Sequence, residues 1–130
     1  MKKILVVDDE VGFTRLLQMN LEKTGNYQVI VVNDSTKALE AARTFKPDLA
    51  LLDIVMPGMD GGDIVAKMKD DPDLCRVPVL MLTALVGRHE ASADAVVQSG
   101  KLLMLSKPVR LSVLVQAIEE QLANAAAART

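Results

Sequence analysis

The sequence predicts an α/β domain built on a doubly wound, five-stranded parallel sheet. Short apolar runs alternate five times along the chain with segments whose apolar residues recur at helical spacing. Polar or turn-forming residues follow each apolar run. Strands that alternate with helices form mostly parallel sheets, with right-handed connections and helices on both faces. The pattern therefore indicates a βα unit repeated five times.

The five apolar runs have the length and composition of strands. The third run ends at a single acid, Asp53, and the chain then turns at Pro57 and Gly58. An uninterrupted apolar run between turn residues predicts a strand buried on both faces. Pro78 stands near the start of the fourth run, where a proline is tolerated. The expected strands cover residues 4–7, 29–32, 49–52, 77–82 and 102–105.

A helix is expected after each strand, because apolar residues recur there at spacings of three and four. The expected apolar stripes lie within residues 13–21, 38–45, 64–68, 91–97 and 111–122. Residues that cap or end helices flank these stripes: Gly25, Asn33 or Asp34, Pro47, Asp71 with Pro72, and Gly100. We expect one domain over residues 1–122. An alanine-rich tail, residues 123–130, either extends the last helix or frays.

Composition narrows the classes of function. The chain has 130 residues, half of them hydrophobic and a quarter charged, which suits one globular domain. A formal net charge of −2 does not favour nucleic acid or an anionic membrane as a direct partner. Only 2% of the residues are aromatic, which argues against base stacking. The single cysteine, Cys75, allows no internal disulfide, and the apolar run after Lys3 is too short for a signal peptide, so we expect a cytoplasmic protein.

Five polar residues stand at or just after strand ends: Asp8, Asp9, Asp53, Thr83 and Lys107. In a parallel sheet, all of these positions fall at the carboxyl edge, where open α/β sheets bind their ligands. Any one of them alone is typical of a solvated loop or a helix cap. Together they are difficult to explain as loop residues. The sequence therefore predicts a functional site at this edge.

The chemistry of these side chains suits a phosphoryl group. Carboxylates that lie close together repel one another unless a cation is present, and Mg²⁺ binds carboxylate and phosphate oxygens. An ionised aspartate can attack phosphorus and form an aspartyl phosphate. A threonine hydroxyl and a lysine ammonium can neutralise phosphoryl oxygens. We therefore expect Asp53 to be a phosphoacceptor that needs Mg²⁺.

Four motifs stand in an order and at a spacing that resemble one known family: ILVVDDE, LALLDIVMPGMDG, VPVLMLTA and LSKP. The chain resembles the receiver domain of bacterial two-component response regulators, most closely the chemotaxis type, over residues 2–122. The resemblance implies a flavodoxin-like strand order, 2-1-3-4-5. It also implies that a sensor histidine kinase phosphorylates Asp53, and that the resulting change of conformation controls a downstream effector.

The resemblance further implies a role for each residue of the site. Mg²⁺ would be bound by Asp53, by Asp9 directly, by Asp8 through water and by the backbone carbonyl of Val55. The phosphoryl oxygens would be contacted by Thr83, Lys107 and the amide of Ala84. Such a domain assists its own phosphorylation and dephosphorylation but is not an enzyme in the ordinary sense.

Three positions depart from the common pattern of the family. Met104 stands where many receivers carry an aromatic switch residue, and it is either a switch residue or simply part of the core. Val55 and Leu85 are apolar at two places where a polar side chain could orient an attacking water, which predicts a slowly hydrolysed phosphoryl group. A face formed by the fourth helix, fifth strand and fifth helix is a possible homodimer or partner surface.

Two other functions remain open. A haloacid-dehalogenase-type phosphatase also uses a strand-end aspartate, but it needs a second aspartate where this chain has Val55. A degenerate receiver would bind a protein partner without being phosphorylated, although the intact set of acids, threonine and lysine argues against this. The downstream output is not visible in the sequence, and the chain is either a stand-alone receiver or the first domain of a longer protein.

Overall fold

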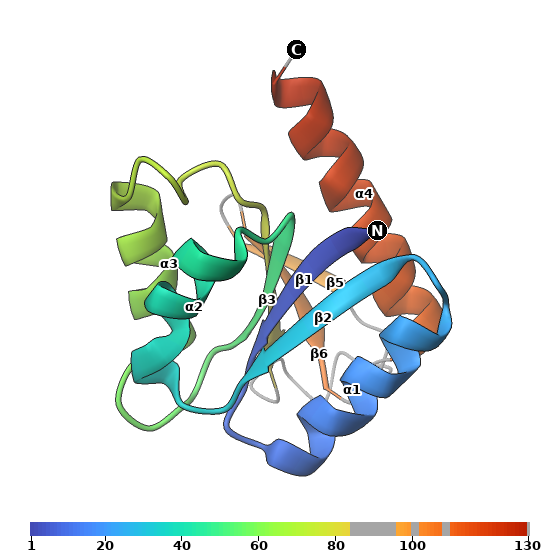
Figure 1. The fold of residues 1–130 in the computed structure, drawn as a ribbon, viewed down its shortest axis with the longest axis horizontal. Coiled ribbons are helices and arrows are strands. Elements are labelled where there is room, and N and C mark those ends of the chain that lie inside the picture. Colours follow the sequence, from blue (N-terminus) through green and yellow to red (C-terminus); the bar gives the residue numbers. More distant parts are fainter. Residues whose placement is uncertain (84–95, 100–101, 108–109, 130) are drawn as a thin grey trace.

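A single sheet of six strands organises the chain (Figure 1). The computed structural model describes residues 1–83, 96–99, 102–107 and 110–129. The strand order is β2-β1-β3-β4-β6-β5. The strands are β1 (Lys2–Val7), β2 (Tyr27–Val32), β3 (Leu49–Asp53), β4 (Val79–Thr83), β5 (Val96–Ser99) and β6 (Leu102–Ser106).

Five of the six strands are parallel and confirm the predicted order 2-1-3-4-5, with β6 as the fifth strand of that order. The register brings the carboxyl ends of the inner strands level with one another. Val7 of β1 pairs with Leu52 of β3, Asp53 pairs with Leu82 of β4, and Thr83 pairs with Ser106 of β6. The residues that follow these strands therefore share one edge of the sheet.

The sixth strand corrects a prediction. Val96 and Val97, expected to lie in a fourth helix over residues 91–97, belong to β5, which pairs antiparallel with β6. Residues 91–95 lie outside the described residues. Branched side chains favour strands over helices, and only two residues of sequence separate β5 from β6, so hairpin pairing competes with the helix. Apolar spacing alone did not reveal this competition.

In the described part of the chain, four α-helices cover the two faces of the sheet (Figure 1). The helices α1 (Val11–Lys23) and α4 (Leu111–Arg129) pack on one face. The opposite face carries α2 (Ala38–Phe45) and α3 (Gly61–Asp70), with the short 3₁₀ helix η1 (Ser35–Lys37) leading into α2. The alanine-rich tail continues α4 as far as Arg129, and the end of this helix projects beyond the sheet. No helix in the described part of the chain is long and apolar enough to cross a membrane.

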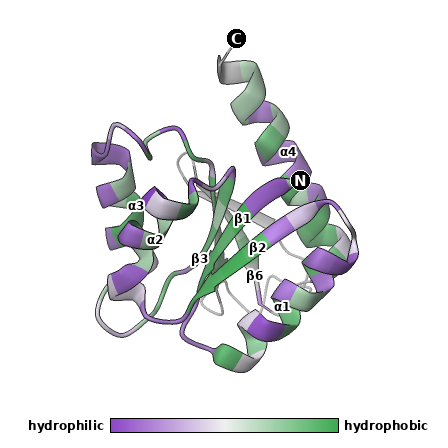
Figure 2. Ribbon diagram, viewed as in Figure 1, coloured by the Kyte–Doolittle hydropathy of each residue, from purple (hydrophilic) through white to green (hydrophobic). Residues whose placement is uncertain are grey.

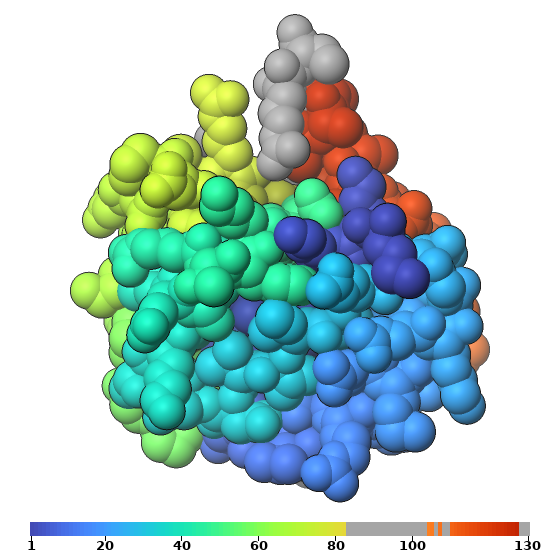
Figure 3. All heavy atoms as spheres, viewed as in Figure 1, coloured from blue at the N-terminus to red at the C-terminus, as the bar shows by residue number. Residues whose placement is uncertain are grey.

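The core has two halves, because side chains of a strand alternate between the faces of the sheet. In β1, Ile4 and Val6 pack towards α1 and α4, whereas Leu5 and Val7 pack towards α2 and α3. All five residues of β3 are buried, as the uninterrupted apolar run predicts. Figure 2 shows the apolar strands in the middle of the molecule. Figure 3 shows a side of the molecule on which residues of β2 and α2 lie at the surface.

The apolar stripe of α1 is narrower than its sequence suggests. Leu17 and Leu21 are buried, as is Thr14 on the same face of the helix. Leu16 belongs to the predicted stripe but is 57% exposed, and Met19 on the same helix is 52% exposed. At 3.6 residues per turn, or about 100° per residue, positions 14, 17 and 21 lie within about 60° of one another, whereas position 16 lies about 100° from the nearest of them. Leu16 instead lines a shallow groove between α1 and α4.

A partly buried hydrogen bond connects β2 to α4. The hydroxyl of Tyr27, which is 2% exposed, donates to the Glu119 carboxylate across 2.5 Å. Burial, and then the hydrogen bond and charge of Glu119, raise the pKa of Tyr27. The folded protein therefore retains this proton more tightly than the unfolded chain does. The tyrosine contributes to stability below its unfolded pKa of about 10, and this contribution is lost as the pH rises further.

We expect Tyr27→Phe to lower the free energy of unfolding by about 1 kcal/mol at neutral pH, the usual contribution of one hydrogen bond. The stability of the variant should also fall less steeply above about pH 10. Urea unfolding at several pH values measures both effects. Gln28→Ala, at the next and exposed position of β2, is the control and should change neither. Equal stability of Tyr27→Phe and the wild type would contradict the prediction.

Candidate functional site

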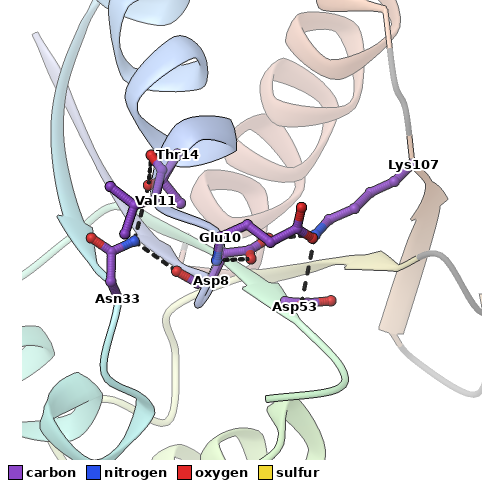
Figure 4. Close-up of polar contacts among 7 residues, drawn as sticks. All are labelled: Asp8, Glu10, Val11, Thr14, Asn33, Asp53 and Lys107. Atoms are coloured by element: carbon purple, nitrogen blue, oxygen red, sulfur yellow. Dashed lines mark hydrogen bonds and ion pairs between the residues drawn. The ribbon is translucent and has the colours of Figure 1, made fainter. Parts of the chain in front are cut away.

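The turn from β1 into α1 supplies the first acids of the site. Asp8 is 1% exposed, and its Oδ1 accepts a hydrogen bond of 3.0 Å from the Glu10 amide. Asp9 and Glu10 are exposed. Glu10 is the N-cap residue of α1, but its side chain caps no helix amide. It points instead towards Lys107, on the same side as Asp8 (Figure 4).

Asn33, just after β2, holds this turn in place. Its side-chain amide donates to the Asp8 carbonyl at 2.8 Å and to the Thr14 hydroxyl at 3.0 Å (Figure 4). The Thr14 hydroxyl in turn donates to the Val11 carbonyl at 3.0 Å. Thr14 is 1% exposed, so this chain of hydrogen bonds satisfies buried polar groups. The contacts fix where the Asp8 carboxylate lies relative to β3.

Asp53 ends β3, in the middle of the sheet, and is 7% exposed. Contacts of Gly61 and Ser35 fix the chain that follows Asp53. The amide of Gly61 donates to the Ile54 carbonyl at 2.8 Å, and a side chain at Gly61 would collide with the Asp53 carbonyl oxygen. Ser35 accepts from the Met59 amide at 3.0 Å and donates to the Pro57 carbonyl at 2.7 Å. The predicted turn at residues 57–58 is therefore braced against η1.

Lys107 follows β6 and brings a positive charge to these acids (Figure 4). Its ammonium lies 2.5 Å from Asp8 Oδ2, 3.2 Å from Glu10 Oε1 and 3.7 Å from Asp53 Oδ2. The lysine side chain is 11% exposed. The ends of β1, β3 and β6 therefore contribute charges to one small region.

The pKa values of Asp53 and Lys107 show that the surrounding charges act differently on these two groups. Burial, and then the negative charge of Asp8, raise the pKa of Asp53 despite the attraction of Lys107. Burial alone would lower the pKa of Lys107, but the hydrogen bond and charge of Asp8, together with Asp53 and Glu10, raise it overall. The surroundings of Lys107 therefore favour its charged form, whereas those of Asp53 disfavour its ionised form.

The oxygens of Asp8, Glu10 and Asp53 lie within 4.8 Å of one another. Carboxylate oxygens are ligands that Mg²⁺ prefers, because it binds hard oxygen ligands and keeps several waters. A divalent cation would also offset the charge that raises the pKa of Asp53. The residues therefore fit a magnesium ion.

The other predicted site residues are either not part of this cluster of acids or lie, wholly or in their side chains, outside the described residues. Asp9 is outside the group of three acids, although its charge contributes to the raised pKa of Asp53. Val55 lies just after β3, with 59% of its surface exposed. Thr83 is the last residue of β4, and its side chain is outside the described part, as are Ala84 and Leu85. Met104 is partly buried and packs against the core on the side of α2 and α3.

Sequence reasoning missed one acid of the site and two residues that support it. Glu10 was not singled out, because an acid at the start of a helix is usually explained by the helix dipole. Asn33 was considered only as a helix cap, but Asp34 accepts from the Thr36 amide and caps η1. The ring of Phe13 lies 4.5 Å from the Lys107 ammonium, although its helical spacing indicated only a core residue.

Comparisons with known proteins point to one family. The sequence model of the response regulator receiver domain matches residues 4–119. The response regulator PleD of Caulobacter vibrioides is 41% identical over 107 residues, which are 82% of this chain and 23% of PleD. PhoP of Bacillus subtilis, an alkaline phosphatase synthesis transcriptional regulatory protein, is 47% identical over 83 residues, or 64% of this chain and 33% of PhoP. The chain thus spans a quarter to a third of these relatives.

A solved structure agrees with the fold. The receiver domain of a sensor histidine kinase from Pseudomonas aeruginosa, determined with a magnesium ion coordinated in its active-site cleft, superposes with a TM-score of 0.76. It is 26% identical, and the match covers 94% of this chain and 98% of that domain.

We expect Asp53→Asn to be more stable than the wild type at pH 7 without added Mg²⁺. The folded protein binds the Asp53 proton more tightly than the unfolded chain does, so ionisation above about pH 4 lowers stability. The melting temperature should rise by roughly 3–6 °C, the change that about 1 kcal/mol produces in a domain of this size. The difference should shrink as the pH falls towards 4.

Asp71→Asn is the control of opposite sign. The hydrogen bond from Arg43 lowers the pKa of Asp71, so ionised Asp71 stabilises the fold, and this variant should melt at a lower temperature than the wild type at pH 7. Thermal melts from pH 4 to pH 8 test both variants. A lower melting temperature for Asp53→Asn at pH 7 would show that the Lys107 attraction outweighs burial and Asp8.

Proposed function

We propose, because this chain belongs to the response regulator receiver domain family, that it is a phosphoacceptor switch whose acceptor is Asp53. The observation that carries the proposal is the position of this carboxylate. It is buried at the carboxyl edge of the sheet, beside the Lys107 ammonium, which also contacts the acids of the β1–α1 turn. Such a group is held in one place and lies beside the lysine charge that can neutralise phosphoryl oxygens.

In the proposed step, a carboxylate oxygen of Asp53 attacks the phosphorus of a phosphohistidine on a sensor histidine kinase. An O–P bond forms, and the P–N bond breaks. The electron pair of the P–N bond returns to the imidazole nitrogen, which takes up a proton. Hydrolysis later returns Asp53 to the free carboxylate. A water oxygen attacks phosphorus, the bond between phosphorus and the Asp53 oxygen breaks, and inorganic phosphate leaves.

Mg²⁺ is the proposed cofactor. Asp8, Glu10 and Asp53 provide the carboxylates that fit it, and the family resemblance adds Asp9 and the Val55 carbonyl. When bound, Mg²⁺ supplies positive charge that neutralises carboxylate and phosphoryl oxygens. Asp8 and Glu10 are held in position by the backbone of the turn and by Lys107. The magnesium ion in the related receiver from Pseudomonas aeruginosa supports this assignment.

Lys107 is the proposed electrostatic partner of the phosphoryl group. Its ammonium lies 3.7 Å from Asp53 Oδ2, so a short movement of a flexible side chain brings it to an oxygen of a group attached there. We assign Thr83 and the Ala84 amide to the other phosphoryl oxygens by resemblance, and the end of β4 beside Asp53 is consistent with this role for Thr83.

Phosphorylation would act as a switch by adding charge at the edge of the sheet and so favouring one of two conformations. Thr83 and Met104 are the proposed path of that change, because β4 and β6 are neighbours in the sheet.

A downstream effector would recognise the new conformation. PhoP and the matching MtrA proteins are regulators of transcription or bind DNA, so an effector domain on a longer chain and a separate partner protein are both possible outputs. A homodimer that uses β6 and α4, the described elements of the predicted dimer face, is a further proposal.

Two alternatives have distinct signatures. A phosphatase would release phosphate from small phosphomonoesters, but Val55, where that class needs an acid, favours a stable aspartyl phosphate. A degenerate receiver would show no phosphorylation. The closeness of Asp8, Asp53 and Lys107 argues against it, because a site without phosphoryl chemistry has no need to bury two acids around one lysine.

Incubation with acetyl phosphate and Mg²⁺ should add the mass of one phosphoryl group to the wild type. Asp53→Asn, which keeps the shape of the side chain but has no nucleophilic carboxylate, should gain none. Intact-mass spectrometry measures both, and omission of Mg²⁺ should abolish the gain in the wild type. No gain in the wild type, with Mg²⁺ binding confirmed, would favour the degenerate receiver.

The aspartyl phosphate should be long-lived, because Val55 is exposed beside Asp53 and offers no polar group to orient water. We expect Val55→Asn to accelerate its hydrolysis by about tenfold, less than the ~100-fold or more that a well-placed general base contributes. Loss of the phosphoryl mass after removal of acetyl phosphate measures the rate. Val55→Ile, which stays apolar, is the matched control. An unchanged rate in Val55→Asn would show that a polar side chain at position 55 does not orient the attacking water.

A further inference from the structure

The Lys107 ammonium lies over an aromatic ring as well as among acids. Its Nζ is 4.5 Å from the centroid of the Phe13 ring. Phe13 stands in the first turn of α1 and packs against the core between the sheet, α1 and α4. Only 2% of the residues in this chain are aromatic, so the ring is a rare side chain at this place. Its contact with the lysine is therefore a specific feature of the site.

The ring and the acids act on the ammonium in different ways. Asp8 and Glu10 attract it at 2.5 and 3.2 Å, closer than the 3.7 Å to Asp53. These carboxylates accept hydrogen bonds and so compete with Asp53 for the lysine. The face of a phenylalanine ring also attracts a cation but accepts no strong hydrogen bond. The ring can therefore confine the ammonium near the acids without competing for its protons.

We propose that Phe13 is a positioning residue for phosphoryl transfer, which it assists by holding the Lys107 ammonium within reach of Asp53. This inference rests on the proposed function of Asp53. A lysine carries its charge on a flexible four-carbon stem, and freedom of that stem would scatter the charge over many positions. The ring limits those positions, so that a phosphoryl group arriving at Asp53 meets the ammonium in place.

A role in packing alone is the competing explanation. Phe13 also lines the shallow groove between α1 and α4, together with Leu16 and Leu111. Loss of the ring could therefore disturb the helix rather than the lysine. The two roles differ in one respect: only positioning requires Lys107 to be present. The test must compare the effect of Phe13 with and without that lysine.

The experiment measures phosphorylation by acetyl phosphate at saturating Mg²⁺, followed by intact mass. Phe13→Leu removes the ring face but keeps an apolar side chain, and we expect the rate to fall about fivefold, the effect of losing one cation–π contact. Phe13→Tyr keeps the ring face and should retain most of the wild-type rate. Leu16→Ala, on the same helix and groove but 57% exposed and away from Lys107, is the control for changes to α1. In a Lys107→Ala background, Phe13→Leu should have no further effect.

A second measurement does not depend on phosphorylation. Protons next to the Lys107 ammonium should show an upfield ring-current shift in the NMR spectrum of the wild type, and Phe13→Leu should remove that shift. A normal shift in the wild type would overturn the proposal, and so would an equal loss of rate from Phe13→Leu with and without Lys107. If the wild type shows the upfield shift but gains no phosphoryl group, the proposed function of Asp53 is refuted. The positioning role of Phe13 in phosphoryl transfer is then refuted as well.

Discussion

The ion pair between Lys107 and Asp8 is the interaction on which the site depends. Asp8 and Asp53 are 1% and 7% exposed, and two carboxylates buried side by side are strongly unfavourable without a positive charge. The lysine provides that charge, and it lies closer to Asp8 than to Asp53. Asp8 is therefore well compensated, whereas Asp53 retains a raised pKa. The charge of Asp53 is therefore the least compensated in the group, and a cation would stabilise its ionised form the most. Asp53 is also the proposed nucleophile.

The sheet brings these charges together because its strands are parallel and in register. Asp53 comes from the middle strand, Asp8 from the end of its neighbour β1, and Lys107 from the far side of β4. A slip of one residue would turn each side chain to the other face. The two halves of the core prevent this slip, since they pack alternate residues of β1 and β3 against different pairs of helices. Packing in the core thus determines distances at the edge.

Much of this arrangement could be predicted from the sequence, because it depends on local patterns. Apolar runs predict the strands, and polar residues at their ends predict that Asp8, Asp53 and Lys107 converge, as the structure places them. The antiparallel strand β5 could not be predicted, since Val96 and Val97 suit a helical stripe and a strand equally well by spacing. The contacts of Asn33 and Phe13 were missed for another reason. Each joins residues far apart in the chain, and one sequence gives no sign of such a pair.

The β1–α1 segment contributes more to the site than the acidic pair in its motif suggests. One turn of chain supplies Asp8 and Glu10 to the lysine, accepts the bracing hydrogen bonds of Asn33, and places the Phe13 ring against the ammonium. The same helix presents Leu16 and Met19 at the surface. A rigid helix that touches the site at its first turn and the surface along its length would transmit any shift of its axis to Lys107. The geometry of the lysine is therefore coupled to the packing of α1, and not only to the acids that surround it.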